Sequence, residues 1–433
     1  MKPRLPLFLE FFFLLFLNSV NAQNKSDAFF ENILNKIPDS TFQMVYHQPE
    51  KYRVQIIYTQ INRDKHNKPS FKNYYFHVNP NLYFNPASTV KMPLAFLALQ
   101  KLHQIKKEGV NKYTTMLTDS AYTAQTKVDK DTTSEDGLPS IAQYIRKVFL
   151  VSDNDAYTRL YEFLGQQYIN RSMHKMGYND VRITLRFMPM TADENRHTNP
   201  IDFLGPNGKI LYHQDAAFNK DSFDFSHIIK MGKGHWNNRD SLINEPIDFT
   251  RANNISLEDL QQIEQSVLFP TSVPKKQRFD LKKDDLKFLY KWMSQYPSET
   301  NYPFYDSSIY YNSFVKMYFK AGGHQLPGNI REFNKPGWAY GFLTDVAYIV
   351  DFKNNTEFML SCTIYVNENQ ILNDNHYEYE AVGYPFMLAL QKAISQYELT
   401  RKRKYLPDLS SFKMNYDHRT ASDRRKQIQE VAD

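Results

Sequence analysis

The sequence predicts a mixed α/β fold of the α+β type, in which an antiparallel sheet from both chain ends carries an inserted all-helical lobe. Runs rich in β-branched and aromatic residues, which are typical of strands, occupy 52–63 and 71–78, and then 338–351 and 359–366. The long section between these two pairs carries apolar residues at helical spacing. We therefore expect the two ends of the chain to meet in one sheet.

The central helix is expected to begin at or just after Ser88, because Pro93 is tolerated only in a first helical turn. Residues 94–102 are apolar on nearly every side, as in a helix buried in the middle of a protein. Further helices are predicted at 141–148, 156–164, 257–267, 281–293 and 381–401.

The first 22 residues have the pattern of a secretory signal peptide. Lys2 and Arg4 form a positive end, an apolar run follows at 7–17, and Ala22 closes an A-x-A-like cleavage site. The alternative is an uncleaved membrane anchor, which the short run and its Glu10 disfavour. We expect a secreted or periplasmic protein with no integral membrane span after removal of the signal.

The remaining chain is predicted as one two-lobed domain at 23–406, with a polar tail at 407–433. The sheet lobe would comprise about 45–87 and 331–405, and the helical lobe about 88–330. The last part of the helical lobe, about 201–330, is rich in Asp, Asn, Tyr and Pro. It reads as an extra insertion, and nothing in its sequence assigns it a chemical role.

Composition argues against several classes of function. The net charge is only +6, and the basic residues gather in 401–404 and 424–426 without a stripe that would suit nucleic acid. The twelve histidines lack metal-ligand spacing, and no phosphate-binding glycine motif is present. The one cysteine, Cys362, is expected in the core. We therefore predict no metal, no cofactor and no nucleic-acid partner.

Three short motifs occur in an informative order. A serine followed three residues later by a lysine occurs five times, but only the pair Ser88 and Lys91 precedes the single Ser-Asp-Asn, which begins at Ser152. A Lys-x-Gly that begins at Lys335 then leads into the predicted strand 338–351. The order indicates a nucleophile, a base and a substrate-binding strand that are distant in sequence and close in space.

Each residue type suits a step of acyl transfer. A serine hydroxyl becomes a good nucleophile only when a base removes its proton. Positions three apart share a face of a helix, so Lys91 can reach the Ser88 oxygen. Burial disfavours the charged ammonium and so produces a neutral amine that can act as base. The alternative, a surface lysine, is disfavoured by the apolar neighbours of Lys91.

The other two motifs would act on the substrate. Ser152 would relay a proton to the leaving group and Asn154 would donate its amide to the substrate, although the same residues also suit an N-cap of the helix at 156–164. Lys335 would face a substrate carboxylate; the alternative is a solvated lysine at a strand start. Gly337 would allow a close backbone approach.

On these motifs the chain resembles the class A β-lactamase family and related penicillin-recognising serine hydrolases. The likeness covers about 52–95, 151–164 and 333–366. It implies a two-lobed β-lactamase/transpeptidase-like fold and an acyl-enzyme mechanism on a small β-lactam, amide or ester substrate. The backbone N–H groups of Ser88 and Trp338 would form the oxyanion hole.

Two departures from the family pattern matter. Pro336 stands where the family has Thr or Ser, so a hydroxyl that helps bind the substrate carboxylate is missing. Met188 stands where the resemblance implies the deacylating glutamate, and Glu194 is the nearest substitute. Acylation is expected to survive these changes, whereas fast hydrolysis of β-lactams, and with it antibiotic resistance, is not implied.

Other functions stay open at this stage. A cell-wall DD-peptidase-like or esterase activity would use the same residues. A non-catalytic module that binds peptidoglycan fragments is a different class, suggested by Pro336 and Met188. The presence of both a nucleophile, Ser88, and a base, Lys91, favours an enzyme, since a pure binder needs neither.

Overall fold

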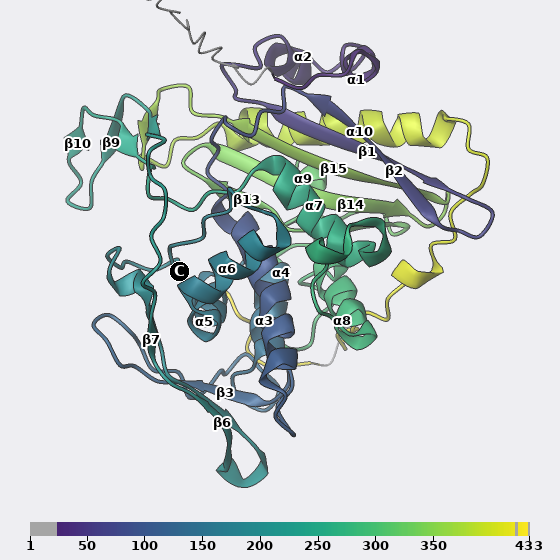
Figure 1. Cartoon of the computed structure of the whole chain (residues 1–433). Helices are drawn as coiled ribbons and strands as arrows, with labels where there is room; N and C mark the ends of the chain where they lie inside the picture. Colours follow the sequence, from purple (N-terminus) through teal and green to yellow (C-terminus); the bar gives the residue numbers. More distant parts are fainter. Residues whose placement is uncertain (1–23, 421–422, 432–433) are drawn as a thin grey trace, which may run out of the picture.

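The computed structural model describes residues 24–420 and 423–431 (Figure 1). The predicted signal peptide, 1–22, lies outside the described residues. The fold is mixed α/β with an antiparallel central sheet and helices on both of its faces, so the predicted fold class is confirmed.

The central sheet joins the two ends of the chain directly. Its order is β2-β1-β15-β14, with β12 and β13 both paired to β14, and every pair is antiparallel. The strands are β1 (Gln55–Arg63), β2 (Pro69–Phe76), β12 (Ile330–Asn334), β13 (Gly337–Ala339), β14 (Phe342–Asp351) and β15 (Thr356–Tyr365). The predicted strands at 52–63, 71–78, 338–351 and 359–366 are present, and the third is divided into β13 and β14.

The sheet is buried on both faces, which explains its nearly continuous apolar strands. Successive residues of β14 alternate between two cores, with Val346 and Tyr348 facing the helical lobe and Ala347 and Ile349 facing the opposite side. All ten residues of β15 are buried. The sheet is therefore the middle layer of three.

The outer layer consists of α1 (Ala28–Leu34), α2 (Ser40–Tyr46) and α10 (Tyr384–Thr400), which lie above the sheet in Figure 1. Phe42 stacks on Phe386 with ring centroids 4.8 Å apart, which joins α2 to α10. The helix predicted at 381–401 is thus confirmed, with a π-helical turn before it.

The inner layer is the helical lobe, and α3 passes through its middle. Every residue of α3 from Lys91 to Gln100 is buried, and Pro93 sits in its first turn as predicted. The other helices of the lobe are α4 (Ile141–Leu150), α5 (Asn154–Leu164), α6 (Gln166–Met176), α7 (Leu257–Leu268), α8 (Lys283–Ser294) and α9 (Met317–Lys320). Those predicted at 141–148, 156–164, 257–267 and 281–293 are confirmed to within three residues.

The prediction of an all-helical inserted lobe needs one correction, because short strands pair at its periphery. They form ribbons that project from the lobe in Figure 1. The strands are β3 (Thr115–Thr118), β4 (His197–Thr198), β5 (Ile201–Leu204), β6 (Ile210–Gln214), β7 (Ala217–Phe218), β8 (Lys230–Met231), β9 (Gly234–Trp236), β10 (Leu242–Ile243), β11 (Ile247–Asp248) and β16 (Ile371–Leu372). Each has two to five residues, too few for periodicity to reveal it in the sequence.

The segment predicted as a polar tail, 407–433, is attached to the protein over its described part. Leu409 and Phe412 are buried, and the Phe412 ring lies 4.8 Å from that of Tyr348. Arg419 donates hydrogen bonds to the backbone oxygens of Pro297, Thr300 and Tyr305. The tail thus follows a defined path along the helical lobe.

Buried ionisable groups lie between α7 and the sheet. The Lys316 ammonium donates hydrogen bonds to the backbone oxygens of Met293 (2.7 Å) and Glu332 (2.9 Å) and to Asn334 Oδ1 (2.6 Å). The Glu264 carboxyl on α7 is fully buried, and within the described chain neither of its oxygens has a hydrogen-bond partner. Burial, followed by the nearby Asp345, raises the pKa of Glu264 well above its ordinary value.

This raised pKa predicts a pH-dependent cost in stability. Because Glu264 binds its proton more tightly in the folded state, the folded state loses stability as pH rises above the unfolded pKa of about 4.3. We expect Glu264→Gln to raise the free energy of unfolding at pH 8, because the neutral amide is close in size to the carboxyl group and has no proton to lose. Urea unfolding at pH 4 and pH 8 measures this difference.

Glu258→Gln on the same helix is the matched control, since Glu258 forms only a partly exposed ion pair with Lys25. It should show no gain at pH 8. A Glu264→Gln variant with the same gain at pH 4 as at pH 8 would contradict the titration argument.

Candidate active site

Ser88 lies on the 3₁₀ turn η1 (Ala87–Val90), which leads directly into α3. The turn is held tightly: the Asn85 side chain accepts a hydrogen bond from the Ala87 N–H at 2.8 Å, and Ala87 has a left-handed φ of 43°. A strained residue beside a candidate nucleophile is typical of functional sites. Ser88 is half-buried and lines a cleft of ≈ 850 Å³.

Lys91 lies one turn further along and is fully buried. Its Nζ donates hydrogen bonds to the backbone oxygen of Ser152, to Asn154 Oδ1 at 2.6 Å and to Ser152 Oγ at 3.3 Å. Nζ also lies 5.1 Å from the centroid of the Phe187 ring. The alternative of a surface lysine is therefore excluded, and the first two motifs meet as predicted.

The Ser-Asp-Asn loop precedes α5, caps that helix and lines the cleft. Asp153, rather than Ser152, is the N-cap: its carboxylate accepts a hydrogen bond from the Ala156 N–H at 2.7 Å and lies 3.5 Å from the Lys147 ammonium. Burial raises the pKa of Asp153, and the positive charge of Lys147 opposes that rise. Ser152 has a left-handed φ of 63°, which turns its hydroxyl into the cleft beside Asn154.

Lys335 follows the last residue of β12 and is also fully buried. Its Nζ donates hydrogen bonds to Ser152 Oγ at 2.9 Å and to the backbone oxygen of Pro336 at 2.8 Å. Burial, followed by the positive charge of Lys91, lowers the pKa of Lys335 well below its ordinary value. Lys335 is thus no solvated lysine, and it faces the Ser152 hydroxyl rather than lining the cleft.

Gly337 begins β13, and the backbone there touches the nucleophile turn. A Cβ at Gly337 would lie 2.5 Å from the Pro86 oxygen, 2.8 Å from the Ser88 nitrogen and 2.9 Å from the Thr89 nitrogen. Only glycine fits at that distance. The close approach brings β13, which also carries Trp338, against the Ser88 N–H. The two groups predicted for the oxyanion hole therefore belong to adjoining backbone segments of one cleft wall.

Glu194, predicted as a deacylating base, does not line the cleft. Its carboxylate accepts hydrogen bonds from the Thr191 N–H at 2.6 Å and the Thr191 hydroxyl at 2.8 Å. These bonds, the backbone one first, lower the pKa of Glu194. From the same loop, Phe187 lines the cleft and lies over Lys91.

The structure adds cleft residues that sequence reasoning did not identify. Most are aromatic or come from the insertion and the chain end, where no motif marks them. They are Phe187, Phe249, Arg251, Asn253, Tyr310, Phe314, Tyr340, Gln429, Glu430 and Val431. Asn253 anchors the insertion, because its Oδ1 accepts hydrogen bonds from the N–H groups of Thr184 (2.8 Å) and Leu185 (3.0 Å). The insertion at 201–330 therefore has a role, as a wall of the cleft.

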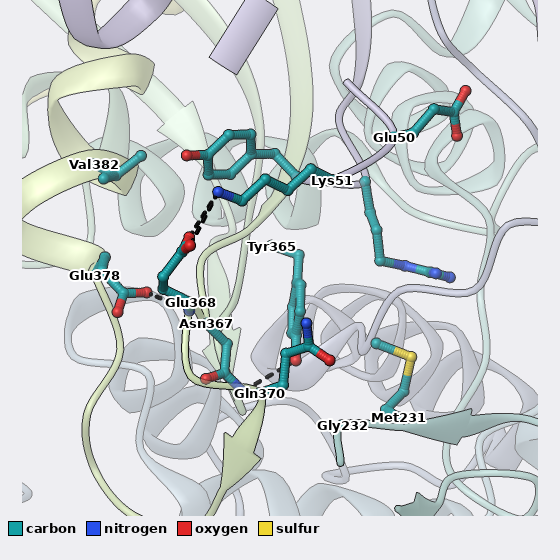
Figure 2. Close-up of a pocket in the computed structure, with 12 residues that line it drawn as sticks. Glu50, Lys51, Met231, Gly232, Tyr365, Asn367, Glu368, Gln370, Glu378 and Val382 are labelled. Atoms are coloured by element: carbon teal, nitrogen blue, oxygen red, sulfur yellow. Dashed lines mark hydrogen bonds and ion pairs between the residues drawn. The ribbon is translucent and has the colours of Figure 1, made fainter. Parts of the chain in front are cut away.

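A second, smaller cavity of ≈ 260 Å³ lies beside the start of β1 and includes none of the predicted site residues. Figure 2 shows Lys51 reaching toward Glu368, with which it forms a 2.8 Å ion pair. In the same cavity the Asn367 amide donates a hydrogen bond to the Tyr365 hydroxyl at 3.0 Å. It offers no serine or cysteine nucleophile.

Residues 24–420 and 423–431 contain no group of three or more His, Cys, Asp or Glu side chains placed to hold a metal ion. Within the same residues, no helix has the length and apolar character needed to cross a membrane.

Residues 42–220 match the model of the beta-lactamase enzyme family. This segment, which is less than half of the chain, is similar to that family. The match includes Ser88, Lys91 and Ser152 and ends before Lys335. The motif that begins at Lys335 is therefore linked to the site only by its contacts in the structure, such as the hydrogen bond from Lys335 to Ser152. It confirms the resemblance predicted from the motifs and supports a serine hydrolase of the β-lactamase type.

Three solved structures illustrate the likeness at the level of coordinates. A beta lactamase from Burkholderia vietnamiensis is 14% identical and covers 82% of this chain and 97% of its own, with a TM-score of 0.43. A class A beta-lactamase from Clostridium kluyveri is 13% identical, and the match covers 82% of this chain and 100% of that protein's chain, with a TM-score of 0.42. A beta-lactamase from Sphaerobacter thermophilus is 13% identical, and the match covers 82% of this chain and 96% of that protein's chain, with a TM-score of 0.40. These scores add nothing to the family match, and no curated protein matches the chain.

The contact at Gly337 predicts that Gly337→Ala slows acylation of Ser88 by at least about 100-fold, the usual effect of a 1 Å misplacement in an active site. The added methyl group must push β13 away from the nucleophile turn. Intact-protein mass spectrometry with a labelled penicillin and a fluorophosphonate measures the rate of adduct formation.

Gly328→Ala is the matched control, because no atom lies within 4 Å of the Cβ it would add. Both variants should keep the circular dichroism spectrum of the parent. A folded Gly337→Ala protein that reacts at the parent rate would show that β13 does not shape the site.

Proposed function

We propose that this protein is an exported serine hydrolase that forms an acyl-enzyme at Ser88 with a β-lactam or a related amide or ester. One observation carries the proposal: two buried lysines, Lys91 and Lys335, both donate hydrogen bonds to the Ser152 hydroxyl, in the cleft that Ser88 lines. Export is supported by the signal-like pattern of residues 1–22, and N-terminal sequencing of the mature protein tests it.

Acylation would begin with attack of Ser88 Oγ on the acyl carbon, while the Ser88 proton passes to the neutral amine of Lys91. The developing oxyanion would accept hydrogen bonds from the N–H groups of Ser88 and Trp338. As the bond to the leaving group breaks, the leaving atom would take a proton from the Ser152 hydroxyl. Lys91 then passes the proton that it took from Ser88 to Ser152, to which it is hydrogen-bonded.

Hydrolysis of the acyl-enzyme requires a water molecule to attack the same carbon, which releases the acid and restores Ser88. The 186–199 loop presents Phe187 to the cleft, while its Glu194 carboxylate is bonded to Thr191. A slow second step follows from this arrangement. We therefore propose a long-lived acyl-enzyme rather than rapid turnover of β-lactams.

The cleft favours acyl donors with aromatic or apolar groups, because aromatic side chains such as Phe249, Tyr310 and Tyr340 line it. A cell-wall DD-peptidase-like or esterase activity would use the same acyl-enzyme and stays the second candidate. The paired lysines disfavour a non-catalytic peptidoglycan-binding module, since burying two amines is costly and binding alone does not need them.

A first prediction concerns the nucleophile. The parent protein should gain the mass of one acyl group after exposure to a labelled penicillin or a fluorophosphonate, and Ser88→Ala should gain none. Peptide mapping should place the adduct on Ser88. Ser172→Ala is the matched control, because Ser172 and Lys175 also lie three apart on a helix, α6, but do not line the cleft. No adduct on the folded parent with any probe would favour the binding module.

A second prediction concerns the lifetime of the adduct. Because the Glu194 carboxylate is held by Thr191 and lies outside the cleft lining, Glu194→Gln should leave the decay rate of the Ser88 adduct within twofold of the parent. The decay is followed by mass spectrometry after removal of free probe. A decay that slows 100-fold or more, the scale expected on losing a general base, would identify Glu194 as the deacylating residue after all.

A further inference from the structure

The end of the described chain forms part of the cleft that holds Ser88. Gln429, Glu430 and Val431 line this cleft together with Ser152 and Trp338. These three residues come from a segment that composition alone presents as a polar tail. In Figure 1 the yellow chain leaves α10 at the right-hand end of the sheet and passes behind the helical lobe.

Backbone pairing holds this segment against the cleft wall. The Ile428 N–H donates to the Phe304 oxygen at 2.8 Å, and the Ile428 oxygen accepts from the Asp306 N–H at 2.9 Å, which makes a parallel bridge to Tyr305. The Val431 N–H then donates to the Tyr310 hydroxyl at 3.2 Å. The segment is therefore positioned by its main chain, as an added strand would be.

Side chains add a second set of contacts to the same wall. Ile428 and Val431 pack against the large hydrophobic core, while Gln429 and Glu430 between them are exposed. Upstream, the Arg425 guanidinium lies 4.2 Å from the centre of the Tyr302 ring and pairs with Asp423 at 2.6 Å. Two apolar anchors thus present an exposed carboxylate, Glu430, at the cleft.

The attachment is modest in strength, since it consists of a few hydrogen bonds and two partly buried apolar side chains. The segment can therefore be removed or displaced without loss of the core, in which only Ile428 and Val431 take a marginal part. Because the segment lines the cleft, its position limits the space that is available to a substrate. Glu430 also places a negative charge where an acyl donor would enter, in a cleft whose exposed cation is Arg251.

We infer that residues 423–431 form a strap that selects acyl donors, by narrowing the cleft against bulky groups and by repelling anionic groups through Glu430. This inference rests on the proposed acylation of Ser88 and adds the class of donor that the site accepts. The favoured donors are compact and carry a neutral or cationic group on the side of the cleft that the strap covers.

The test compares full-length protein with a chain ending at residue 422, using a small alkyl fluorophosphonate and a bulky fluorophore-labelled penicillin with an anionic dye. Ending the chain at 422 should raise the acylation rate with the bulky probe at least tenfold and change the rate with the small probe by less than twofold. Circular dichroism confirms that the shortened chain is folded.

Two point variants keep the test valid if the shortened chain is unstable. Val431→Asp should release the strap and reproduce the gain with the bulky probe, whereas Glu430→Gln should raise only the rate with the anionic probe, relative to an uncharged dye. Lys426→Gln, an exposed strap residue that does not line the cleft, should match the parent with both probes.

The outcomes separate the two claims. Equal rates for the parent, the shortened chain and Val431→Asp with every probe would overturn the strap while the acylation of Ser88 stands. A folded parent that reacts with neither probe contradicts the proposed function, and the strap fails with it.

Discussion

Two buried amines that converge on one hydroxyl are the constraint on which the rest of the site depends. Lys91 Nζ lies 3.3 Å and Lys335 Nζ lies 2.9 Å from Ser152 Oγ, and both lysines are fully buried. Two ammonium charges held this close in a low-dielectric interior repel one another strongly. The lowered pKa of Lys335 relieves the repulsion by favouring its neutral form. A neutral amine hydrogen-bonded to Ser152, in the cleft that Ser88 lines, suits the proposed acyl transfer.

The fold supplies this arrangement from three distant parts of the chain. The apolar α3 buries Lys91, the Asp153 cap on α5 fixes the loop of Ser152, and the end of β12 delivers Lys335. Pro336 has no N–H and separates β12 from β13, so the chain can leave the β14 edge and return at Gly337.

A buried network behind the site fixes the residue before Lys335. The Asn334 amide donates to the Asp345 carboxylate at 2.9 and 3.0 Å, while Asn334 Oδ1 accepts from Lys316 at 2.6 Å. Desolvation raises the pKa of Asp345 to about 6, with Asn334 and Lys316 among the groups that oppose the rise. Such a network, once satisfied, specifies one conformation. The position of Lys335 is therefore set from the core side as well as by Ser152.

Much of this arrangement could be predicted from the sequence, and the features that could not be predicted each have a physical reason. The apolar run 94–102 and the run 338–351, rich in aromatic and β-branched residues, identified the buried helix and strand, because a pattern over many residues is a strong signal. The order of the motifs located Ser88, Lys91 and Ser152. The burial of Lys335 could not be foreseen, because it depends on packing against Ser152, 183 residues away in the sequence. The position of Glu194 outside the cleft lining could not be foreseen either, because it depends on a local turn with Thr191. The strap was hidden because only Ile428 and Val431 mark it within a polar run.

Different parts of the cleft therefore control different properties of the proposed enzyme. The buried lysines govern whether Ser88 reacts, and they belong to the sheet and to the helical core. Phe187 lies 5.1 Å from Lys91 Nζ, on the loop where the resemblance implied a carboxylate, and an aromatic ring has no group that can take a proton from water. The lifetime of an acyl-enzyme is thus a property of that loop. The choice of donor belongs instead to peripheral segments, the insertion and the strap, which can vary without disturbing the lysines. A site built this way can keep its nucleophile while changing both its substrate and the duration of its covalent state.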